Sequence, residues 1–148
     1  MCGIAGFVSS RGRPAERGVI EVMTATLARR GPDGSGVHVA GPVALGHRRL
    51  SIIDVEGGAQ PLSNEDDSVW VTYNGELYNE LPLRAGLEAR GHRYKTRTDT
   101  ETLVHLYEDD GFEFVGRLNG MFALAIWDEP RQRLVLARDR MGQKPLYY

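Results

Sequence analysis

The first residues of the chain contain its only thiol. Cys2 follows Met1 directly, and the 148 residues include no other cysteine. Removal of Met1 would give Cys2 a free α-amine, and such amines titrate near neutrality, at a pKa of about 7.7–8. The amine could then accept the thiol proton, so Cys2 is a candidate nucleophile with its own base. The alternative is an incidental small residue at a frayed terminus, and the first eight residues favour neither interpretation.

A second candidate lies in the segment GHRRLSIID, residues 46–54. Its paired arginines, Arg48 and Arg49, follow a histidine and precede apolar residues that we expect to be buried. A guanidinium binds a carboxylate through two parallel hydrogen bonds, which gives it a directionality that lysine lacks. One of these arginines could therefore be an anion clamp. The alternative is an ordinary solvated surface pair.

Asn74 and Gly75 follow the strand-like segment Val69 to Tyr73. An asparagine NH2 and the following glycine N–H can point the same way and form an oxyanion hole for an acyl-transfer transition state. Asn-Gly is also the most common signal for a tight hairpin turn. The sequence does not separate the two uses.

These residues must be positioned by the surrounding elements. Apolar runs predict strands at residues 4–8, around 37–39 and 43–45, at 69–73, at 121–127 and at 134–137. Helical spacing predicts helices at about 15–29, 82–90 and from 99 to about 110. The last helix follows Thr98-Asp99-Thr100-Glu101, a capping-box pattern, so the simplest role for Asp99 and Glu101 is at the helix start. We expect RRGPDGSG, residues 29–36, to be a turn and residues 56–67 to be a surface loop.

Composition limits the class of protein. The chain has a net charge of −2 and is 41% hydrophobic and 26% charged, which predicts one globular domain and no nucleic-acid partner. No apolar run reaches the roughly 20 residues of a membrane span, so no membrane partner is expected. A single cysteine excludes an internal disulfide, and the four histidines share no metal-ligand spacing. We expect no metal and a cytoplasmic location, where a reducing compartment keeps Cys2 as a thiol.

Several blocks together carry a family resemblance. They are CGIAGF at Cys2, RGPDGSG at Arg30, LGHRRLSIID at Leu45, GAQPL at Gly58, YNGELYN at Tyr73, TRTDTETLVHLYE at Thr96, LNGMFALAIWD at Leu118 and LARDRMGQKPLYY at Leu136. In this order the chain resembles the glutaminase domain of class II glutamine amidotransferases, the N-terminal-nucleophile kind, of asparagine-synthetase type. The resemblance implies an α+β fold, a four-layer αββα sandwich with mostly antiparallel sheets.

The resemblance also implies site residues. It implies that Cys2 is the nucleophile, that Asn74 and Gly75 form the oxyanion hole, and that Arg49 grips the glutamine α-carboxylate. Glu76 and Asp99 would hold the α-ammonium group. The pocket would be completed by the four residues that follow Arg49, which are Leu50, Ser51, Ile52 and Ile53.

The expected reaction is hydrolysis of L-glutamine to glutamate and ammonia through a Cys2 thioester. The expected partner is a synthetase domain or chain that accepts the ammonia in an asparagine-synthetase-like reaction, and a homodimer is a further expectation. The family continues into an ATP-using domain, so we expect residues 1–148 to be a C-terminally incomplete glutaminase domain. ATP and Mg are expected only for the absent domain, and no cofactor for this chain. The alternative function is a non-catalytic remnant that binds glutamine or a partner chain.

Overall fold

Two antiparallel sheets form the centre of the computed structural model, which describes residues 1–51 and 57–148. The first sheet has the order β1-β3-β2, with bounds β1 (Gly3–Val8), β2 (Gly34–Ala40) and β3 (Val43–Arg49). The second has the order β4-β5-β6-β7, with bounds β4 (Leu62–Ser63), β5 (Val69–Leu77), β6 (Gly120–Asp128) and β7 (Arg133–Arg138). Every neighbouring pair is antiparallel.

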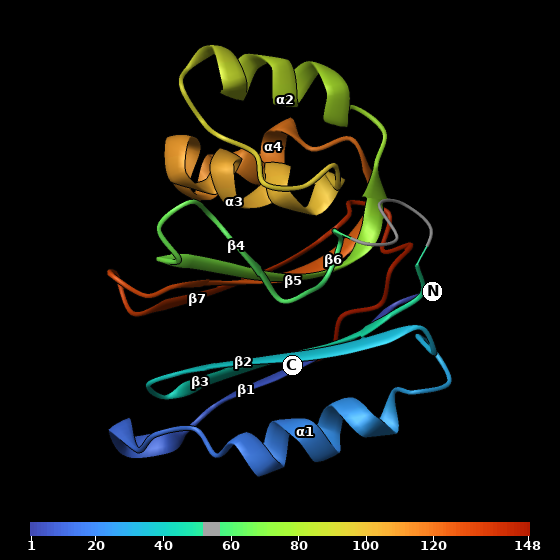
Figure 1. The fold of residues 1–148 in the computed structure, drawn as a ribbon, viewed down its shortest axis with the longest axis vertical. Coiled ribbons are helices and arrows are strands. Elements are labelled where there is room, and N and C mark those ends of the chain that lie inside the picture. The colour runs from blue at the N-terminus through green and yellow to red at the C-terminus, as the bar shows by residue number, and fades with distance from the viewer. Residues whose placement is uncertain (52–56) are drawn as a thin grey trace.

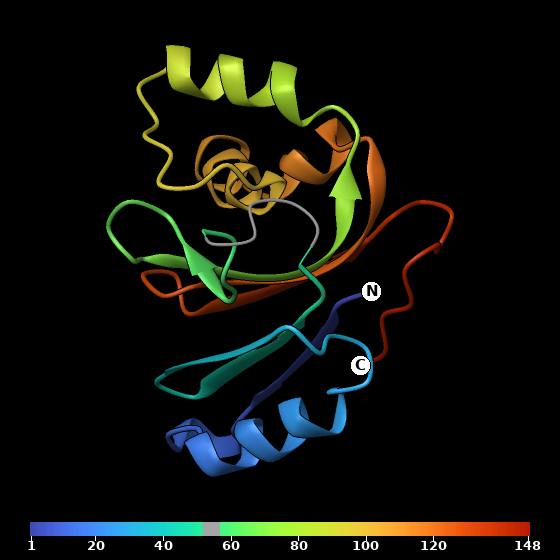
Figure 2. The same ribbon diagram turned by 45° about the vertical axis from the view of Figure 1, so that its right-hand side comes forward.

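Helices cover the two outer faces of this pair of sheets. The helical elements are η1 (Ser10–Gly12), α1 (Arg17–Thr26), α2 (Glu80–Ala89), α3 (Asp99–Asp110), η2 (Gly111–Glu113) and α4 (Phe114–Arg117). In Figures 1 and 2, α1 lies below the three-stranded sheet, and α2, α3 and α4 lie above the four-stranded sheet. The predicted four-layer αββα sandwich is therefore confirmed.

Strand alternation assigns the faces of β5, because successive side chains point to opposite sides of a sheet. Val71, Tyr73 and Leu77 join the apolar cluster beneath the helices. Trp70 packs instead into a cluster between the two sheets. Asn74 is four residues after Trp70 and so points to the same side of β5. Its side chain therefore faces the three-stranded sheet, which contains β1, the strand that follows Cys2.

Helix α3 is buried along almost its whole length. All residues from Asp99 to Tyr107 are buried, because α3 lies between α2 on one side and the four-stranded sheet on the other (Figure 1). The predicted apolar stripe is confirmed, with Leu103, Val104, Leu106 and Tyr107 in the core. Polar residues at the start of this helix are consequently buried as well.

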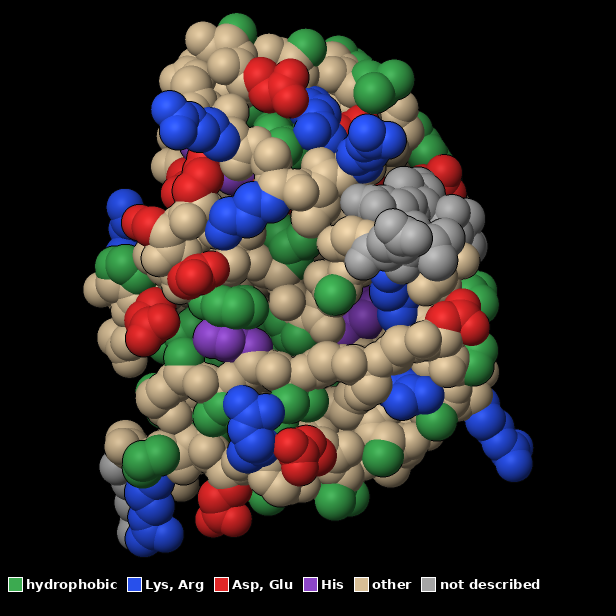
Figure 3. Space-filling model, in the orientation of Figure 1, with side chains coloured by type: hydrophobic (Ala, Val, Ile, Leu, Met, Phe, Trp, Pro, Cys, Tyr) green, Lys and Arg blue, Asp and Glu red, His purple; other side chains and the backbone are tan. Residues whose placement is uncertain are grey.

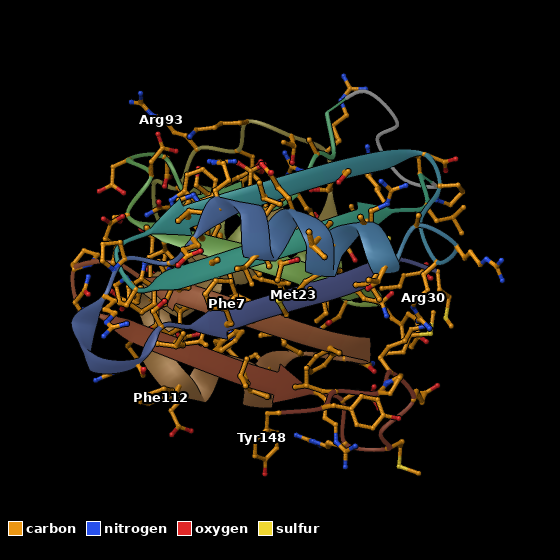
Figure 4. All side chains as sticks on the ribbon, turned by 90° about the horizontal axis from the view of Figure 1, so that it is seen from below. Phe7, Met23, Arg30, Arg93, Phe112 and Tyr148 are labelled. Carbon is orange, nitrogen blue, oxygen red and sulfur yellow. The ribbon has the colours of Figure 1, made fainter. Side chains whose placement is uncertain are left out.

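Helix α1 covers the first sheet and ends before the loop that leads to β2. Phe7 of β1 and Met23 of α1 pack against the same small cluster as Ile20, and Figure 4 looks onto this side of the molecule. The helix ends at Thr26 rather than near Arg29, and residues 27–30 form turns. Among the described residues no helix is long and apolar enough to cross a bilayer.

Four local expectations need correction. Gly34–Gly36 belong to β2 rather than to a turn, and the expected loop at 56–67 contains the short strand β4. Asn74 and Gly75 are interior residues of β5, paired with Ala123 and Phe122 of β6, so they form no hairpin turn. Pairing to a long β6 overrides the local turn preference, because the ladder continues to Leu77.

The fourth correction concerns the helix start at Thr98. Its hydroxyl makes no capping hydrogen bond to α3. The Glu101 carboxylate, instead of reaching back to Thr98, accepts hydrogen bonds from the backbone N–H groups of Lys95 and Thr96, at 2.6 and 2.7 Å. The S/T-x-x-E pattern thus marks the helix start correctly, but Glu101 fastens the preceding loop.

Candidate active site

Cys2 lies at the edge of the first sheet, beside the end of β3. Gly3 pairs with Arg48, which brings the neighbouring Cys2 next to the backbone of Leu50. The Leu50 N–H donates to the Cys2 sulfur at 3.4 Å, and the sulfur lies 3.8 Å from the Leu50 carbonyl oxygen. The thiol is therefore held by the backbone of the residue after Arg49, and it is only partly buried.

The loop before β2 braces this corner of the molecule. Arg30, at the far end of α1 in Figure 4, donates from Nε to the Cys2 carbonyl oxygen at 3.2 Å. The Asp33 N–H donates to the Arg49 carbonyl at 2.9 Å, and the Asp33 carboxylate accepts from the Ser51 N–H at 2.8 Å. A segment that the sequence predicted only as a turn thus fixes the backbone on both sides of Leu50.

An open cavity lies beside the thiol. We call it the Cys2 cavity, and its lining residues are Cys2, Arg49, Leu50, Gly58, Gln60, Tyr73, Gly75, Thr98, Asp99 and Thr100. Five residues predicted from the sequence meet there: Cys2, Arg49, Leu50, Gly75 and Asp99. Residues that carry a thiol, a guanidinium and a carboxylate, from three distant segments, therefore line one open cavity.

Asp99 presents a buried carboxylate to the Cys2 cavity. It is 9% exposed, and its Oδ2 atom accepts hydrogen bonds from the Tyr73 hydroxyl at 3.0 Å and from the Leu77 N–H at 2.9 Å. Burial raises the pKa of this carboxyl group above its ordinary value, although the two hydrogen bonds oppose the shift. A buried anion of this kind would gain from a cationic ligand group.

The other predicted residues lie around the Cys2 cavity rather than on its wall. Ser51 lines an adjacent cavity that shares Arg49 and Gln60 with it. Glu76 is exposed and lines a depression on the other side of Asp99. Asn74 is buried, at 5% exposure, on the β5 face toward the first sheet. Ile52 and Ile53 fall outside the described residues.

Gln60 is a cavity residue to which the sequence assigned no role. Its Oε1 atom accepts from the Tyr73 N–H at 2.7 Å, and its Nε2 atom donates to the Thr100 hydroxyl at 3.2 Å. It therefore joins β5 to the first turn of α3 on either side of Asp99. The sequence feature that could have indicated Gln60 is the GAQPL block. This block was part of the family resemblance, but none of its side chains has an evident catalytic role.

Gly58, the first residue of the GAQPL block, lies close to the Arg49 side chain. A Cβ atom at this position would lie 2.2 Å from Arg49 Nη2 and 2.8 Å from a Thr98 methyl carbon. A side chain at position 58 would therefore displace the Arg49 guanidinium from its observed place. Gly58 therefore helps to set the position of the predicted clamp.

His47 lies just behind Arg49 and is almost fully buried. Its Nδ1 atom is 3.3 Å from the Thr72 hydroxyl, which itself donates to the Gly46 carbonyl at 3.1 Å, so Nδ1 is the donor. Burial, reinforced by the positive charge of Arg49, lowers the pKa of His47 to about 4. His47 is thus neutral at physiological pH and adds no second cation beside Arg49.

One face of the molecule carries both signs of charge. On the face shown in Figure 3, basic and acidic side chains are interspersed over all four layers. This matches the net charge of −2 and gives no support to a polyanionic partner on that face.

Sequence comparison gives one family over the whole chain. The family model described as "Glutamine amidotransferase domain" matches residues 1–148. Asparagine synthetase [glutamine-hydrolyzing] 3 of Bacillus subtilis (strain 168) is 46% identical over 100% of this chain and 25% of its own length. Asparagine synthetase [glutamine-hydrolyzing] 2 of Oryza sativa subsp. japonica is 44% identical over 99% of this chain and 25% of its own. The chain thus spans about a quarter of the length of these relatives.

Solved structures share the fold. The glutamine phosphoribosylpyrophosphate amidotransferase from B. subtilis, complexed with ADP and GMP, matches 93% of this chain and 36% of its own, with a TM-score of 0.68 at 22% identity. A structure described as the allosteric regulatory enzyme of purine biosynthesis matches 70% of this chain and 25% of its own, with a TM-score of 0.58 at 30% identity. The first likeness concerns the fold alone.

Proposed function

This chain belongs to the glutamine amidotransferase domain family, and from that premise we propose that it hydrolyses L-glutamine to glutamate and ammonia with Cys2 as the nucleophile. One observation carries the proposal. The Cys2 cavity brings the single thiol together with Arg49 and Asp99. A zwitterionic amino acid needs one fixed cation, one fixed anion and a nucleophile within reach of its side-chain amide, and this cavity offers all three.

Substrate binding is assigned to the two charged residues. Arg49 would bind the α-carboxylate through a two-pronged contact, and Asp99 would bind the α-ammonium group. The hydrogen bonds from Tyr73 and Leu77 hold Asp99 in place, while Gln60 fixes the strand and helix that flank it. Glu76 would add a second negative charge from the exposed side.

The chemical step begins after removal of Met1. The Cys2 α-amine takes the thiol proton, and the thiolate forms a bond to the side-chain amide carbon of glutamine. The amide π-electrons move to oxygen, and the Asn74 amide and the Gly75 N–H stabilise that oxyanion. The C–N bond then breaks, and the departing nitrogen takes the proton held by the α-amine, so ammonia leaves and a γ-glutamyl thioester remains.

Water completes the cycle. It attacks the thioester carbon and gives its proton to the α-amine, and the C–S bond breaks to release glutamate. The proton returns to the Cys2 sulfur. The sum is one glutamine and one water converted to glutamate and ammonia, with the protein unchanged.

The destination of the ammonia is part of the proposal. The relatives from Bacillus subtilis and Oryza sativa described above are named glutamine-hydrolysing asparagine synthetases, and each is about four times as long as this chain. We therefore propose that the ammonia serves an amidotransfer by a synthetase domain or chain, in the cytoplasm. The competing proposal, a non-catalytic remnant that binds glutamine, makes no use of the thiol beside Arg49 and Asp99.

The decisive experiment follows Cys2 directly. The purified chain is incubated with an electrophilic glutamine analogue, its intact mass is measured, and ammonia release from glutamine is assayed. We expect loss of Met1, one adduct per chain, and turnover that is abolished in Cys2→Ala. A chain with an uncleaved N-terminal extension keeps the thiol but ties its amine in a peptide bond, and it should also be inactive. Substantial ammonia release by Cys2→Ala would exclude Cys2 as the nucleophile.

A further inference from the structure

A cluster of two histidines and two glutamates lies away from the Cys2 cavity. Its members are Glu65 in the β4–β5 turn, His92 in the α2–α3 connection, and His105 and Glu108 on α3. One ligand atom from each lies within 4.8 Å of the others. Figures 1 and 2 both show the β4–β5 turn and the α2–α3 connection on the same side of α3.

Some of the separations between these atoms are close to those of a tetrahedral metal site, and the others are longer. His105 Nδ1 lies 3.2 Å from Glu108 Oε2 and 3.5 Å from Glu65 Oε2. His92 Nδ1 lies 3.8 Å from both Glu108 Oε2 and Glu65 Oε1. Tetrahedral zinc with ligands at about 2.0–2.1 Å requires ligand atoms to be about 3.3–3.4 Å apart. Because the four ligand atoms are up to 4.8 Å apart, a bound ion would have to draw the exposed carboxylates of Glu65 and Glu108 inward.

The two carboxylates are already oriented by other groups. Glu65 Oε1 accepts from the Arg93 N–H at 2.9 Å, and Glu108 Oε1 accepts from Asn64 Nδ2 at 2.7 Å. In each case the second oxygen, Oε2, is the one that approaches His105. Asn64 is itself buried, and its Oδ1 atom accepts from the backbone N–H groups of Ser68 and Val69.

The two histidines turn their Nδ1 atoms to the centre of the cluster and their Nε2 atoms to outer carboxylates. His92 Nε2 is 3.0 Å from Asp109 Oδ1. His105 Nε2 is buried without a hydrogen-bond partner, and its nearest carboxylate oxygen, on Glu101, is 3.7 Å away. For His92, the Asp109 carboxylate behind the second nitrogen is the usual support of a metal-bound histidine, because it fixes the ring and its tautomer.

We propose that Glu65, His92, His105 and Glu108 bind one zinc ion. Two imidazoles and two carboxylates form a donor set that zinc accepts, and the charge of two carboxylates matches that of a divalent cation. Four protein ligands leave no open position, which makes the site structural rather than catalytic. The ion would tie the β4–β5 turn and the α2–α3 connection to α3.

This site is separate from the proposed glutaminase site. In Figure 4, Arg93, whose N–H holds Glu65, lies on the opposite side of the molecule from Arg30, which holds Cys2. None of the four ligands lines the Cys2 cavity. The inference therefore stands or falls independently of the reaction assigned to Cys2.

The rival interpretation is an ion-pair network without metal. Burial lowers the pKa of His105, but the carboxylates of Glu101, Glu108 and Glu65 outweigh it and raise the pKa to about 9. In that case a proton on His105 balances the negative charge of the surrounding carboxylates, and the cluster does not bind zinc. A direct measurement of metal binding distinguishes the two interpretations.

The test uses the full chain as Cys2→Ala, because a terminal cysteine can chelate zinc by itself. Metal is removed with a chelator, Co²⁺ is added, and the strong visible absorption of tetrahedral Co²⁺ is followed, with zinc as competitor. We expect one Co²⁺ per chain, displaced by one Zn²⁺, and a melting temperature that rises with zinc.

Matched variants identify the ligands. Glu65→Gln and His92→Asn change solvent-accessible ligands, so they should fold while weakening zinc binding at least tenfold. Asp109→Asn should weaken it by about 10–100-fold, the usual effect of removing an outer-shell carboxylate. Glu113→Gln changes an exposed acid just beyond α3 and should bind as the parent does. No binding at micromolar zinc, or equal binding by Glu65→Gln, His92→Asn and the parent, would overturn the proposal.

Discussion

The backbone N–H of Leu50 donates to the sulfur of Cys2 at 3.4 Å, and Leu50 directly follows Arg49. The candidate nucleophile therefore contacts the residue that directly follows the candidate carboxylate clamp at the end of β3. Hydrogen bonds from Asp33 on either side of Leu50 hold this backbone. The backbone positions from which the Cys2 thiol and the Arg49 side chain project are thus fixed relative to each other.

The first prediction concerns this clamp. Arg49→Ala should raise the glutamine KM far more than it lowers kcat, because losing one partner of a desolvated charge pair costs on the order of 2–5 kcal/mol. Arg49→Lys should already weaken binding, since lysine cannot form the two-pronged contact. Steady-state ammonia release measures both constants. Arg29→Ala is the control: Arg29 is exposed in the turn at residues 27–30, so its loss should leave KM unchanged.

A glutamine analogue without the α-carboxylate sharpens this test. The parent should strongly prefer glutamine, and Arg49→Ala should no longer distinguish the two. A parent that hydrolyses both equally well would remove the clamp assignment, and with it the amino-acid specificity proposed for the Cys2 cavity.

The second prediction concerns the oxyanion hole. Asn74→Ala should lower kcat by roughly 10²–10³, the usual loss for one preorganised donor, with a much smaller change in KM. Asn79→Ala is the matched control. Its amide bonds the Arg117 carbonyl outside the Cys2 cavity, so kcat should stay near the parent value. A large rise in KM at constant kcat would instead make Asn74 a binding or structural residue.

The sequence predicted the elements of this fold better than the ends of those elements. Apolar periodicity located the strands and the buried face of α3, because those patterns reflect contacts that each segment makes along its whole length. The Asn74-Gly75 turn signal was misleading because it is local, whereas the strand partner, β6, lies about 50 residues later in the chain. Gly34–Gly36 were similarly drawn into β2 by pairing with β3.

The sequence could predict those site residues whose chemistry is evident from the residue type alone. A lone cysteine after Met1 and a paired arginine suggest roles by themselves. Gln60 and Arg30 do not, because their effect lies in hydrogen bonds to Tyr73, Thr100 and Cys2 that only the folded chain creates. The proposed zinc ligands escaped a search by spacing for the same reason, since three separate segments contribute them.

The third prediction is that Asp99→Asn stabilises the fold while impairing substrate binding. Burial raises the pKa of Asp99 in the folded state, so ionisation at neutral pH is a cost to folding. That cost is absent below the pKa of the unfolded state, grows as pH rises from there to the raised pKa of the folded state, and is constant above it. The asparagine oxygen can still accept from Tyr73 and Leu77. Thermal unfolding at pH 7 should therefore show a higher melting temperature for Asp99→Asn than for the parent.

The same variant should raise the glutamine KM tenfold or more, because the substrate ammonium loses its buried counter-charge. Glu76→Gln is the control: Glu76 is exposed, so its loss should change KM less and should not stabilise the fold. The stability gain of Asp99→Asn should vanish near pH 3, where the parent carboxyl is protonated. A gain that persists there would mean that burial of charge is not its cause.

The last prediction concerns His47 and acid stability. Burial and Arg49 lower its folded-state pKa to about 4, whereas a histidine in an unfolded chain has a pKa of about 6.5. Between these values the unfolded chain binds a proton that the folded chain does not, so stability must fall as pH falls through this window. The full difference is on the order of 3 kcal/mol. His47→Gln cannot titrate, so its free energy of unfolding should decrease less than that of the parent between pH 7 and pH 4.5.

The comparison is one of slopes, because His47→Gln also loses packing at every pH. Denaturant unfolding at several pH values gives the slope for each protein. Thr72→Val is the matched control: it removes the hydroxyl to which His47 Nδ1 donates but leaves the buried imidazole in place. Since burial is the main cause of the low pKa, Thr72→Val should keep the acid sensitivity of the parent. Equal slopes for the parent and His47→Gln would show that another group controls acid unfolding.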